Sequence, residues 1–275
     1  MKWATKPNFY LLMLFLKLKF IPMKRILVPV NFSQVSKDAV KSAATLARKS
    51  GGDIVLFHVI EDSEIVAETR EKAESFLAMR ELDGIVCHYK QTTGDPIEEI
   101  VAQQLDLIVM GSGGAKGIEN FFISTLSEEV SREADCPVIN LKEFVDLGKV
   151  KSIVFPTDMR VDQGEVIDDI KALQSFYGAH LHLIKVFNDT LVLERDVKKR
   201  LEDFASFHGL TDYSVSARPN IDKSEEILEF AQELNASMIA MGIHDRHGLD
   251  KLLGGFVAKD VINEGKIAIW TKVIN

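Results

Sequence analysis

The sequence contains little cysteine: its 275 residues include two, Cys87 and Cys136. Two isolated thiols do not make the disulfide framework typical of small secreted domains. We therefore expect a reducing compartment, the cytoplasm. We interpret both cysteines as small buried hydrophobic residues rather than as a redox pair.

The sequence also lacks an excess of basic residues. It has 33 Lys and Arg against 41 Asp and Glu, a formal net charge of −8. Nucleic-acid binding relies on a basic patch or stripe that matches the phosphate backbone. No such stripe offsets the acidic residues here, so a nucleic-acid partner is not expected.

No hydrophobic run is long enough for an ordinary membrane span. The most apolar stretch is FYLLMLFLKLKF in residues 1–22, and Lys17 and Lys19 interrupt it. No small-residue cleavage site follows, so a signal peptide is not favoured. We interpret residues 1–22 as an extension outside the folded core, with Met23 as the natural start. An amphipathic membrane tether is the alternative interpretation, although a membrane partner is not expected.

Motifs for catalysis are missing as well: there is no nucleophile elbow, no metal-hydrolase motif and no P-loop with a Gly-Lys-Ser/Thr ending. His244 and His247 have a spacing that chelates metal, but no further ligand is identifiable nearby, so a solvated loop is favoured. His58 and His182, in the second strand of each half, are interpreted as structural. The sequence predicts a protein that is not an enzyme, with slow ATP hydrolysis as a less favoured alternative.

The chain does contain an internal repeat of about half its length. RILVPVNFS at residues 25–33 corresponds to SIVFPTDMR at 152–160, and LDLIVMGSGG at 105–114 corresponds to ASMIAMGIHD at 236–245. Pro29 and Pro156 lie 127 positions apart, whereas Met110 and Met241 lie 131 apart. A shorter helix and connection in the first copy would account for the difference of four. We predict a tandem duplication with a polar joint at residues 141–151.

Each half alternates apolar strands with amphipathic helices. Continuous apolar runs such as RILVPV are typical of strands buried on both faces, and SKDAVKSAATLARKSGG has helical spacing and a glycine stop. This alternation predicts a parallel sheet with helices on both faces. Ligands of such sheets bind beyond the carboxyl ends of the strands, where the strand order reverses.

A cluster of glycines follows the fourth strand of the first half. Gly111 and Gly114 lack side chains that would keep a ligand away from the backbone. Ser124 and Thr125 are expected at the start of the next helix, where unpaired amides attract anions. Clustered glycines also occur in ordinary turns, so the informative feature is the spacing Gly111-x2-Gly114-x9-Ser124-Thr125.

These segments together resemble the universal stress protein family. The resemblance extends from Met23 to the end of the chain, as two domains, and rests on ILVPVNFS, GDPIEEIV, MGSGG and ADCPVINL, in the order of the family. It implies, for each domain, a flavodoxin-like fold related to the adenine nucleotide alpha hydrolases, with a five-stranded parallel sheet of order 3-2-1-4-5. It also implies pairing of domains through the last strand, which two halves of one chain can achieve internally as a pseudo-dimer. The domains are expected at 23–143 and 149–275.

The resemblance further implies an ATP site with the pattern G-x2-G-x9-G-[S/T] and an aspartate at the end of the first strand. The first half keeps two glycines and the final hydroxyl residue, but Ser124 replaces the third glycine and Asn31 replaces the aspartate. Asn31 retains a hydrogen-bonding carbonyl without the charge. The residues carried over here are Pro29, Val30, Asn31, Met110, Gly111, Gly114, Ser124 and Thr125.

The second half departs from the pattern differently. Asp158, Gly242 and Gly255 match it, but Asp245 replaces the second glycine and Phe256 replaces the hydroxyl residue. A carboxylate about 4 Å from a phosphate costs roughly 1 kcal/mol even in water. ATP is therefore expected in the first half in preference to the second.

The resemblance implies a stress-response protein that binds ATP or another adenine nucleotide, with Mg²⁺ accompanying the nucleotide. The alternative is a nucleotide-free interaction scaffold in which both loops are relics. A homodimer of the whole chain is left open alongside the internal pseudo-dimer.

Overall fold

The structure is a computed structural model. It describes residues 23–60, 66–103, 105–113, 118–159, 164–189, 191–244 and 255–274. The predicted extension at 1–22 lies outside these residues. In the described part of the chain, no helix is both long enough and apolar enough to cross a membrane.

The first half alternates strands and helices as predicted. Its first helix begins where the Ser33 hydroxyl accepts a hydrogen bond from the Ser36 amide, and it ends at Gly51, which has a φ of 63°. The elements are β1 (Arg25–Pro29), α2 (Gln34–Ser50), β2 (Asp53–Ile60), α3 (Val66–Leu77), the 3₁₀ helix η1 (Arg80–Leu82), β3 (Cys87–Thr93), α4 (Pro96–Val101), β4 (Leu107–Gly111), α5 (Ile118–Glu133) and β5 (Val138–Leu141).

The second half repeats the same order of elements. They are β6 (Ser152–Pro156), α6 (Gly164–Tyr177), β7 (His180–Phe187), α7 (Glu194–Phe207), β8 (Tyr213–Pro219), α8 (Lys223–Glu233), β9 (Met238–His244), α9 (Gly255–Glu264) and β10 (Ala268–Ile274).

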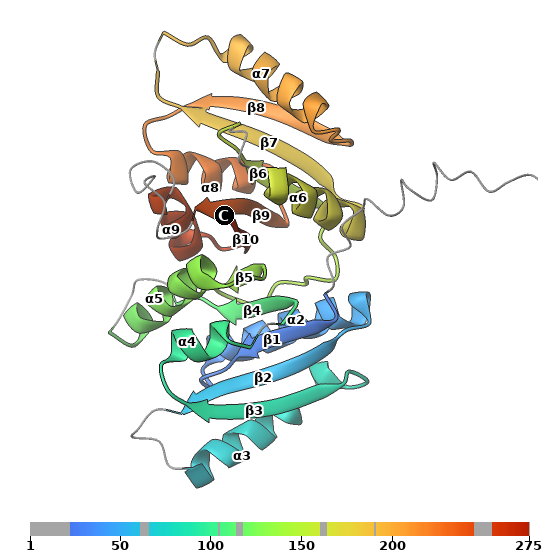
Figure 1. The fold of residues 1–275 in the computed structure, drawn as a ribbon, viewed down its shortest axis with the longest axis vertical. Coiled ribbons are helices and arrows are strands. Elements are labelled where there is room, and N and C mark those ends of the chain that lie inside the picture. The colour runs from blue at the N-terminus through green and yellow to red at the C-terminus, as the bar shows by residue number, and fades with distance from the viewer. Residues whose placement is uncertain are drawn as a thin grey trace, which may run out of the picture.

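The strands form one sheet of ten strands in the order β3-β2-β1-β4-β5-β10-β9-β6-β7-β8. Each half has the predicted order 3-2-1-4-5, and its strands are parallel. The pairing of β5 with β10 is antiparallel and joins the halves. The sheet twists so strongly that the arrows of β2, β3, β7 and β8 all point to the same side of the molecule (Figure 1).

The strand registers show how closely the two halves match. Ile26 pairs with Leu107 between β1 and β4, and Ile153 pairs with Met238 between β6 and β9. The offsets are 127 for the first strands and 131 for the fourth, as the sequence predicts. The difference arises mainly in the helix before the fourth strand, because α4 has 6 residues and α8 has 11.

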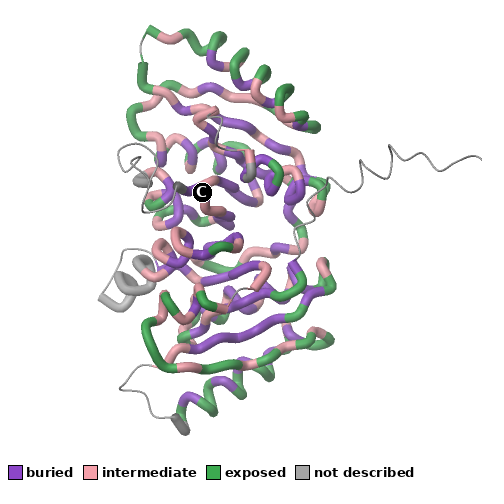
Figure 2. Tube along the Cα trace, viewed as in Figure 1, coloured by how far each residue is buried: buried purple, intermediate pink, exposed green. Residues whose placement is uncertain are grey.

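Helices cover both faces of the sheet. Buried residues gather on its inner strands, whereas the edge strands β3 and β8 are mostly half-buried or exposed (Figure 2). A large core beneath α2, α3, α6 and α7 contains residues of both halves, including Leu46 and Leu173. On the other face, α4 and α5 cover one smaller core, and α8 and α9 cover another. Successive residues of β1 alternate between faces, with Ile26 and Val28 in the large core and Leu27 in the smaller one.

The joint between the halves is less polar than predicted. Leu147 and Val150 are buried in the large core. The hydroxyls of Ser42 and Thr45 on α2 accept hydrogen bonds from the amides of Val145 (3.0 Å) and Gly148 (3.2 Å). The joint is therefore fixed along α2 rather than exposed as a free linker.

Candidate functional site

The predicted first-half site lies at the edge of the sheet between β1 and β4. The strand order reverses there, because β2 and β3 lie on one side of β1 and β4 and β5 follow on the other. β1 ends at Pro29 and β4 ends at Gly111, and the two strands pair directly. The fold thus brings Pro29, Val30 and Asn31 together with Met110 and Gly111 at one carboxyl edge.

A tight turn follows β1. The Val30 amide donates to the carbonyl of Phe57 on β2 at 2.8 Å. The side-chain oxygen of Asn31 accepts from the Ser33 amide at 3.2 Å and from the Ser33 hydroxyl at 2.6 Å. Phe32 between them has a φ of 62°, which is unusual for a residue with a side chain. Asn31 therefore has a structural role in directing the chain into α2.

Aromatic packing supports this turn. The ring of Phe32 lies 4.7 Å from that of His58 and 5.3 Å from that of Phe76, centroid to centroid. His58 is buried, and its Nδ1 lies 2.7 Å from the carbonyl oxygen of Val30. These contacts agree with a structural role for His58.

Gly111, at the end of β4, lies directly against the start of α2. A Cβ at this position would lie 2.4 Å from Cγ1 of Val35 and 3.0 Å from the Val35 carbonyl oxygen. The next residue, Ser112, is buried and its amide donates to the Leu141 carbonyl at 2.7 Å. Close helix packing thus requires glycine at 111, independently of any ligand. Gly114 lies outside the described residues.

The prediction that Ser124 and Thr125 begin a helix is wrong. Both lie within α5, which starts six residues earlier at Ile118. Ile118, Phe121 and Phe122 are apolar residues at helical spacing and extend the helix toward its N-terminus. The free amides at the start of α5 therefore belong to residues near 118, not to the Ser-Thr pair.

The second-half crevice repeats the turn with different chemistry. The Thr157 amide donates to the Ile184 carbonyl at 3.0 Å, and Met159 repeats the φ of 62° seen at Phe32. Asp158 occupies the position of Asn31. Lys185 occupies the position of His58, and its Nζ lies 3.4 Å from the Asp158 carbonyl oxygen. A cationic side chain thus replaces the buried imidazole of the first half.

Gly242 of the second half is also in tight surroundings. A Cβ at Gly242 would lie 2.5 Å from Cδ1 of Ile274 and 3.2 Å from Cγ2 of Val166. Ile274 belongs to β10, which has seven residues where β5 has four. Gly255 is the first residue of α9. Asp245 lies outside the described residues.

His182, Cys87 and Cys136 have surroundings that fit a structural role. Nδ1 of His182 lies 2.8 Å from the Ser214 hydroxyl, and burial, followed by the nearby His180, lowers the pKa of His182. His182 is not equivalent to His58, because Lys185 holds that position. Burial raises the pKa values of the Cys87 and Cys136 thiols to about 11, which keeps both neutral at pH 7.

In the described part of the chain, no group of three or more His, Cys, Asp or Glu side chains could hold a metal ion. The backbone of His244 ends β9, while His247 lies outside the described residues. The predicted preference for a solvated loop at this pair stays a prediction.

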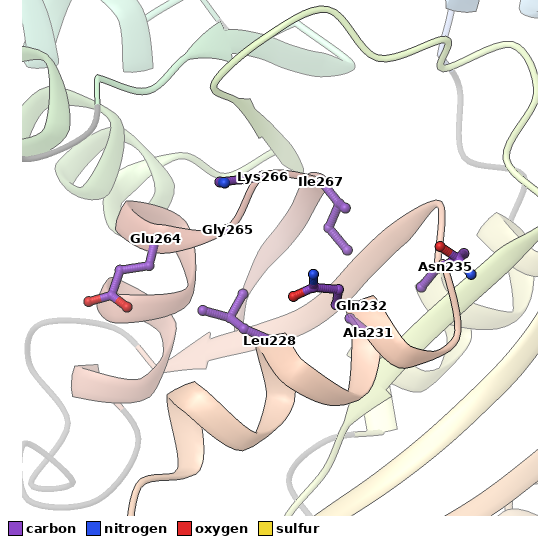
Figure 3. A pocket seen from close by; sticks show the side chains of 9 residues that line it. Leu228, Ala231, Gln232, Asn235, Glu264, Gly265, Lys266 and Ile267 are labelled. Carbon is purple, nitrogen blue, oxygen red and sulfur yellow. The ribbon is translucent and has the colours of Figure 1, made fainter.

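A pocket of about 420 Å³ lies elsewhere, between the C-terminal ends of α8 and α9. Leu228, Gln232 and Ile267 line it with Glu264 and Lys266 at its rim (Figure 3). Both helices lead into the amino ends of strands β9 and β10, so this is the edge opposite the second-half crevice. Sequence reasoning missed this pocket. The feature of the sequence that could have indicated it is the extra length of α8 compared with α4, because the additional residues of α8 form one wall of the pocket.

Comparison with known proteins decides the family. The model of the "Universal stress protein family" matches residues 22–142 and 218–271, more than half of the chain. The chain belongs to the universal stress protein family. The two matched segments fall in the two halves, which agrees with tandem universal stress protein folds.

Individual relatives support this assignment. A universal stress protein of Methanocaldococcus jannaschii is 29% identical over 140 residues, covering 44% of this chain and 82% of the relative. A second from the same organism is 25% identical over 153 residues, covering 43% and 94%. The crystal structure of a universal stress protein from Archaeoglobus fulgidus matches 93% of this chain and 98% of its own, with a TM-score of 0.73 and 20% identity. That last likeness shows the fold.

Proposed function

We propose that this universal stress protein binds an adenine nucleotide, ATP with Mg²⁺, in the crevice of its first half. The proposal includes the domain boundaries 23–143 and 149–275, with one crevice in each domain. The expected role is nucleotide-dependent contact with other proteins during stress, without efficient catalysis.

The observation that carries this proposal is the position of the glycine-bearing loop. It leaves β4 at Gly111, beside the end of β1, at the reversal of strand order where open parallel sheets bind ligands. The start of α5 follows this loop, and its unpaired amides and partial positive charge favour a phosphate group. The spacing Gly111-x2-Gly114 matches the family pattern at this place.

The second-half crevice is the weaker candidate. Asp245 stands at the second glycine position, and its carboxylate repels phosphate. The side chain of Ile274 fills the space next to Gly242. In the first half, β5 ends at Leu141, so no β-strand residue extends to the equivalent position.

A nucleotide-free scaffold is the second candidate, and two contacts favour it. Packing against Val35 explains Gly111 without a ligand, and the Asn31 side-chain oxygen is engaged by Ser33. In this alternative the crevice residues serve the fold, and the paired halves act as an interaction surface.

Thermal unfolding with and without millimolar Mg-ATP separates the two candidates. A site at 100 times its dissociation constant gains about 2.7 kcal/mol of stability, which we expect as a rise in Tm of several degrees. Gly114→Asp should abolish the rise, because it places a carboxylate in the loop, as Asp245 does in the second half.

Gly164→Asp is the matched control, because a Cβ at Gly164 meets no atom within 4 Å. It should keep the full nucleotide shift. If Mg-ATP does not raise the Tm of the unmodified chain, the nucleotide proposal is wrong and the nucleotide-free scaffold is the remaining candidate function. Phosphate release beyond one equivalent per chain, lost in Gly114→Asp, would instead show an ATPase.

A further inference from the structure

The two halves meet around a local two-fold axis in the middle of the sheet. In the antiparallel pairing of β5 with β10, Val138 lies opposite Thr271, Ile139 opposite Trp270 and Asn140 opposite Ile269. With the offset of 131, Ile139 and Trp270 are equivalent residues of the two copies. The axis therefore passes between these two residues, and the contact of Val138 with Thr271 corresponds to that of Ile269 with Asn140. β5 and β10 lie in the middle of the molecule, between the two halves (Figure 1).

The charges across this axis differ between the copies. Glu128 on α5 and Lys259 on α9 are equivalent positions, since 259 − 128 = 131, and they form an ion pair at 3.1 Å. Glu128 is 12% exposed and also pairs with Arg132 at 3.2 Å. Two identical halves would place two glutamates, or two lysines, at this contact.

The sizes of the side chains differ in the same way. Ile139 and Trp270 are both fully buried. An Ile–Ile pair at the axis would leave a cavity, and a Trp–Trp pair would overpack the same space.

Two further lysines cross between the halves. Lys272 on β10 donates to the carbonyl of Asp135, just beyond the end of α5, and Lys142 donates to the carbonyl of Asn263 near the end of α9. The equivalents of Asp135 and Asn263 are Lys266 and Arg132. A half paired with a copy of itself would thus bring Lys272 toward Lys266, or Lys142 toward Arg132.

We infer that β5 with α5 and β10 with α9 form two equivalent but non-identical surfaces, each of which fits the opposite half and rejects a copy of the same half. Charge at 128 and 259 and side-chain size at 139 and 270 set this choice. The partner of β5 is β10, either of the same chain or, in a domain-swapped dimer, of a second copy of the chain. Pairing of two first halves or two second halves is disfavoured. The inference does not depend on nucleotide binding.

Single substitutions in the full chain recreate each disfavoured contact. Lys259→Glu places two glutamates at the axis, as two first halves would, and Glu128→Lys places two lysines there, as two second halves would. We expect each to raise the equilibrium constant of unfolding in urea about fivefold. The exchanged double variant E128K/K259E restores opposite charges and should lose much less than the two single losses combined.

A second cycle tests size. Trp270→Ile and Ile139→Trp give the Ile–Ile and Trp–Trp pairs, and I139W/W270I transposes the native pair. Each single variant should lower the urea midpoint, and the transposed variant should recover part of that loss. Circular dichroism is the readout, because these variants move the tryptophan.

Glu194 and Lys198, an ion pair at 2.6 Å within α7, provide the control for the charge cycle. Their exchange lies within one half and should change the urea midpoint little in either single variant. Additive losses in the axis charge cycle would overturn the inference, and so would single axis variants that unfold at the wild-type midpoint. If Ile139→Trp does not fold, the charge cycle alone decides.

Discussion

At the scale of single residues, Gly111 shows a motif position that serves packing. Its φ is not left-handed, so the steric conflict with Val35 alone decides what substitution costs. We expect Gly111→Ala to destabilise the nucleotide-free protein by about 2 kcal/mol, since the rigid Val35 side chain and backbone must move. Urea unfolding without nucleotide measures this.

The matched controls are Val35→Ala combined with Gly111→Ala, and Gly164→Ala alone. The double variant should lose less than the sum of its parts, because one clashing methyl is gone. Gly164→Ala, in open space at the start of α6, should gain about 0.5 kcal/mol. Wild-type stability of Gly111→Ala would contradict this packing requirement for glycine.

At this scale the sequence could predict which residues lie at the carboxyl ends of the central strands. It could not predict which side chains those residues contact. Pro29, Asn31 and Gly111 reach the same edge because strand ends and a reversal of strand order follow from the pattern. The hydrogen bonds from Ser33 to Asn31 and the contact of Val35 with Gly111 depend on the exact approach of α2 to the sheet. No spacing in the sequence specifies that approach.

At the scale of elements, the two helices before the fourth strands begin with equivalent caps. Asp95 caps α4 and Asp222 caps α8, both through side-chain oxygens that accept backbone amides. The Glu225 amide, followed by the Ser224 hydroxyl, holds the pKa of the Asp222 carboxyl below its usual value of 3.8. The ionised form is thus favoured by folding.

We expect Asp222→Ala to lower the Tm at pH 7. Because the folded pKa is depressed, this stabilisation is complete well above pH 3.8 and is lost as the pH falls through the lower folded pKa. The Tm difference between wild type and variant should therefore shrink below pH 3.8. Asp222→Asn retains an acceptor that does not titrate, so its advantage over Asp222→Ala should not depend on pH. A Tm difference constant from pH 7 to pH 3 would contradict the role of this carboxylate.

Helices and strands were more predictable from the sequence than individual contacts, and the start of α5 shows where the prediction failed. The strand at Arg25–Pro29 and the helix that ends before Gly51 appear as predicted, because a continuous apolar run marks the strand and a glycine stop ends the helix. The start of α5 was placed too late, since Ser124-Thr125 is both a plausible cap and part of the family motif. A cap signal inside a helical apolar pattern does not start a helix.

At the scale of the whole molecule, the repeat predicted two domains, but the structure shares one core between them. Leu46, Leu173 and Trp270 belong to the same buried cluster, and Leu147 of the joint lies within it. The resemblance implied the pairing of the last strands, β5 with β10, but not that the buried residues beneath the two halves merge into one core. Which faces meet depends on the sheet twist rather than on the repeat.

This shared core predicts that both halves unfold together. Trp270 reports on the axis, and circular dichroism reports on all helices, so the two urea transitions should coincide in a Trp3→Phe background. Trp270→Ala should cost about 4 kcal/mol, since it empties a fully buried site, and should shift a single transition seen by circular dichroism. Two separated transitions would mean that the large core does not couple the halves. A single transition with an m value fitting the whole described chain would show that the ten-stranded sheet is one cooperative unit.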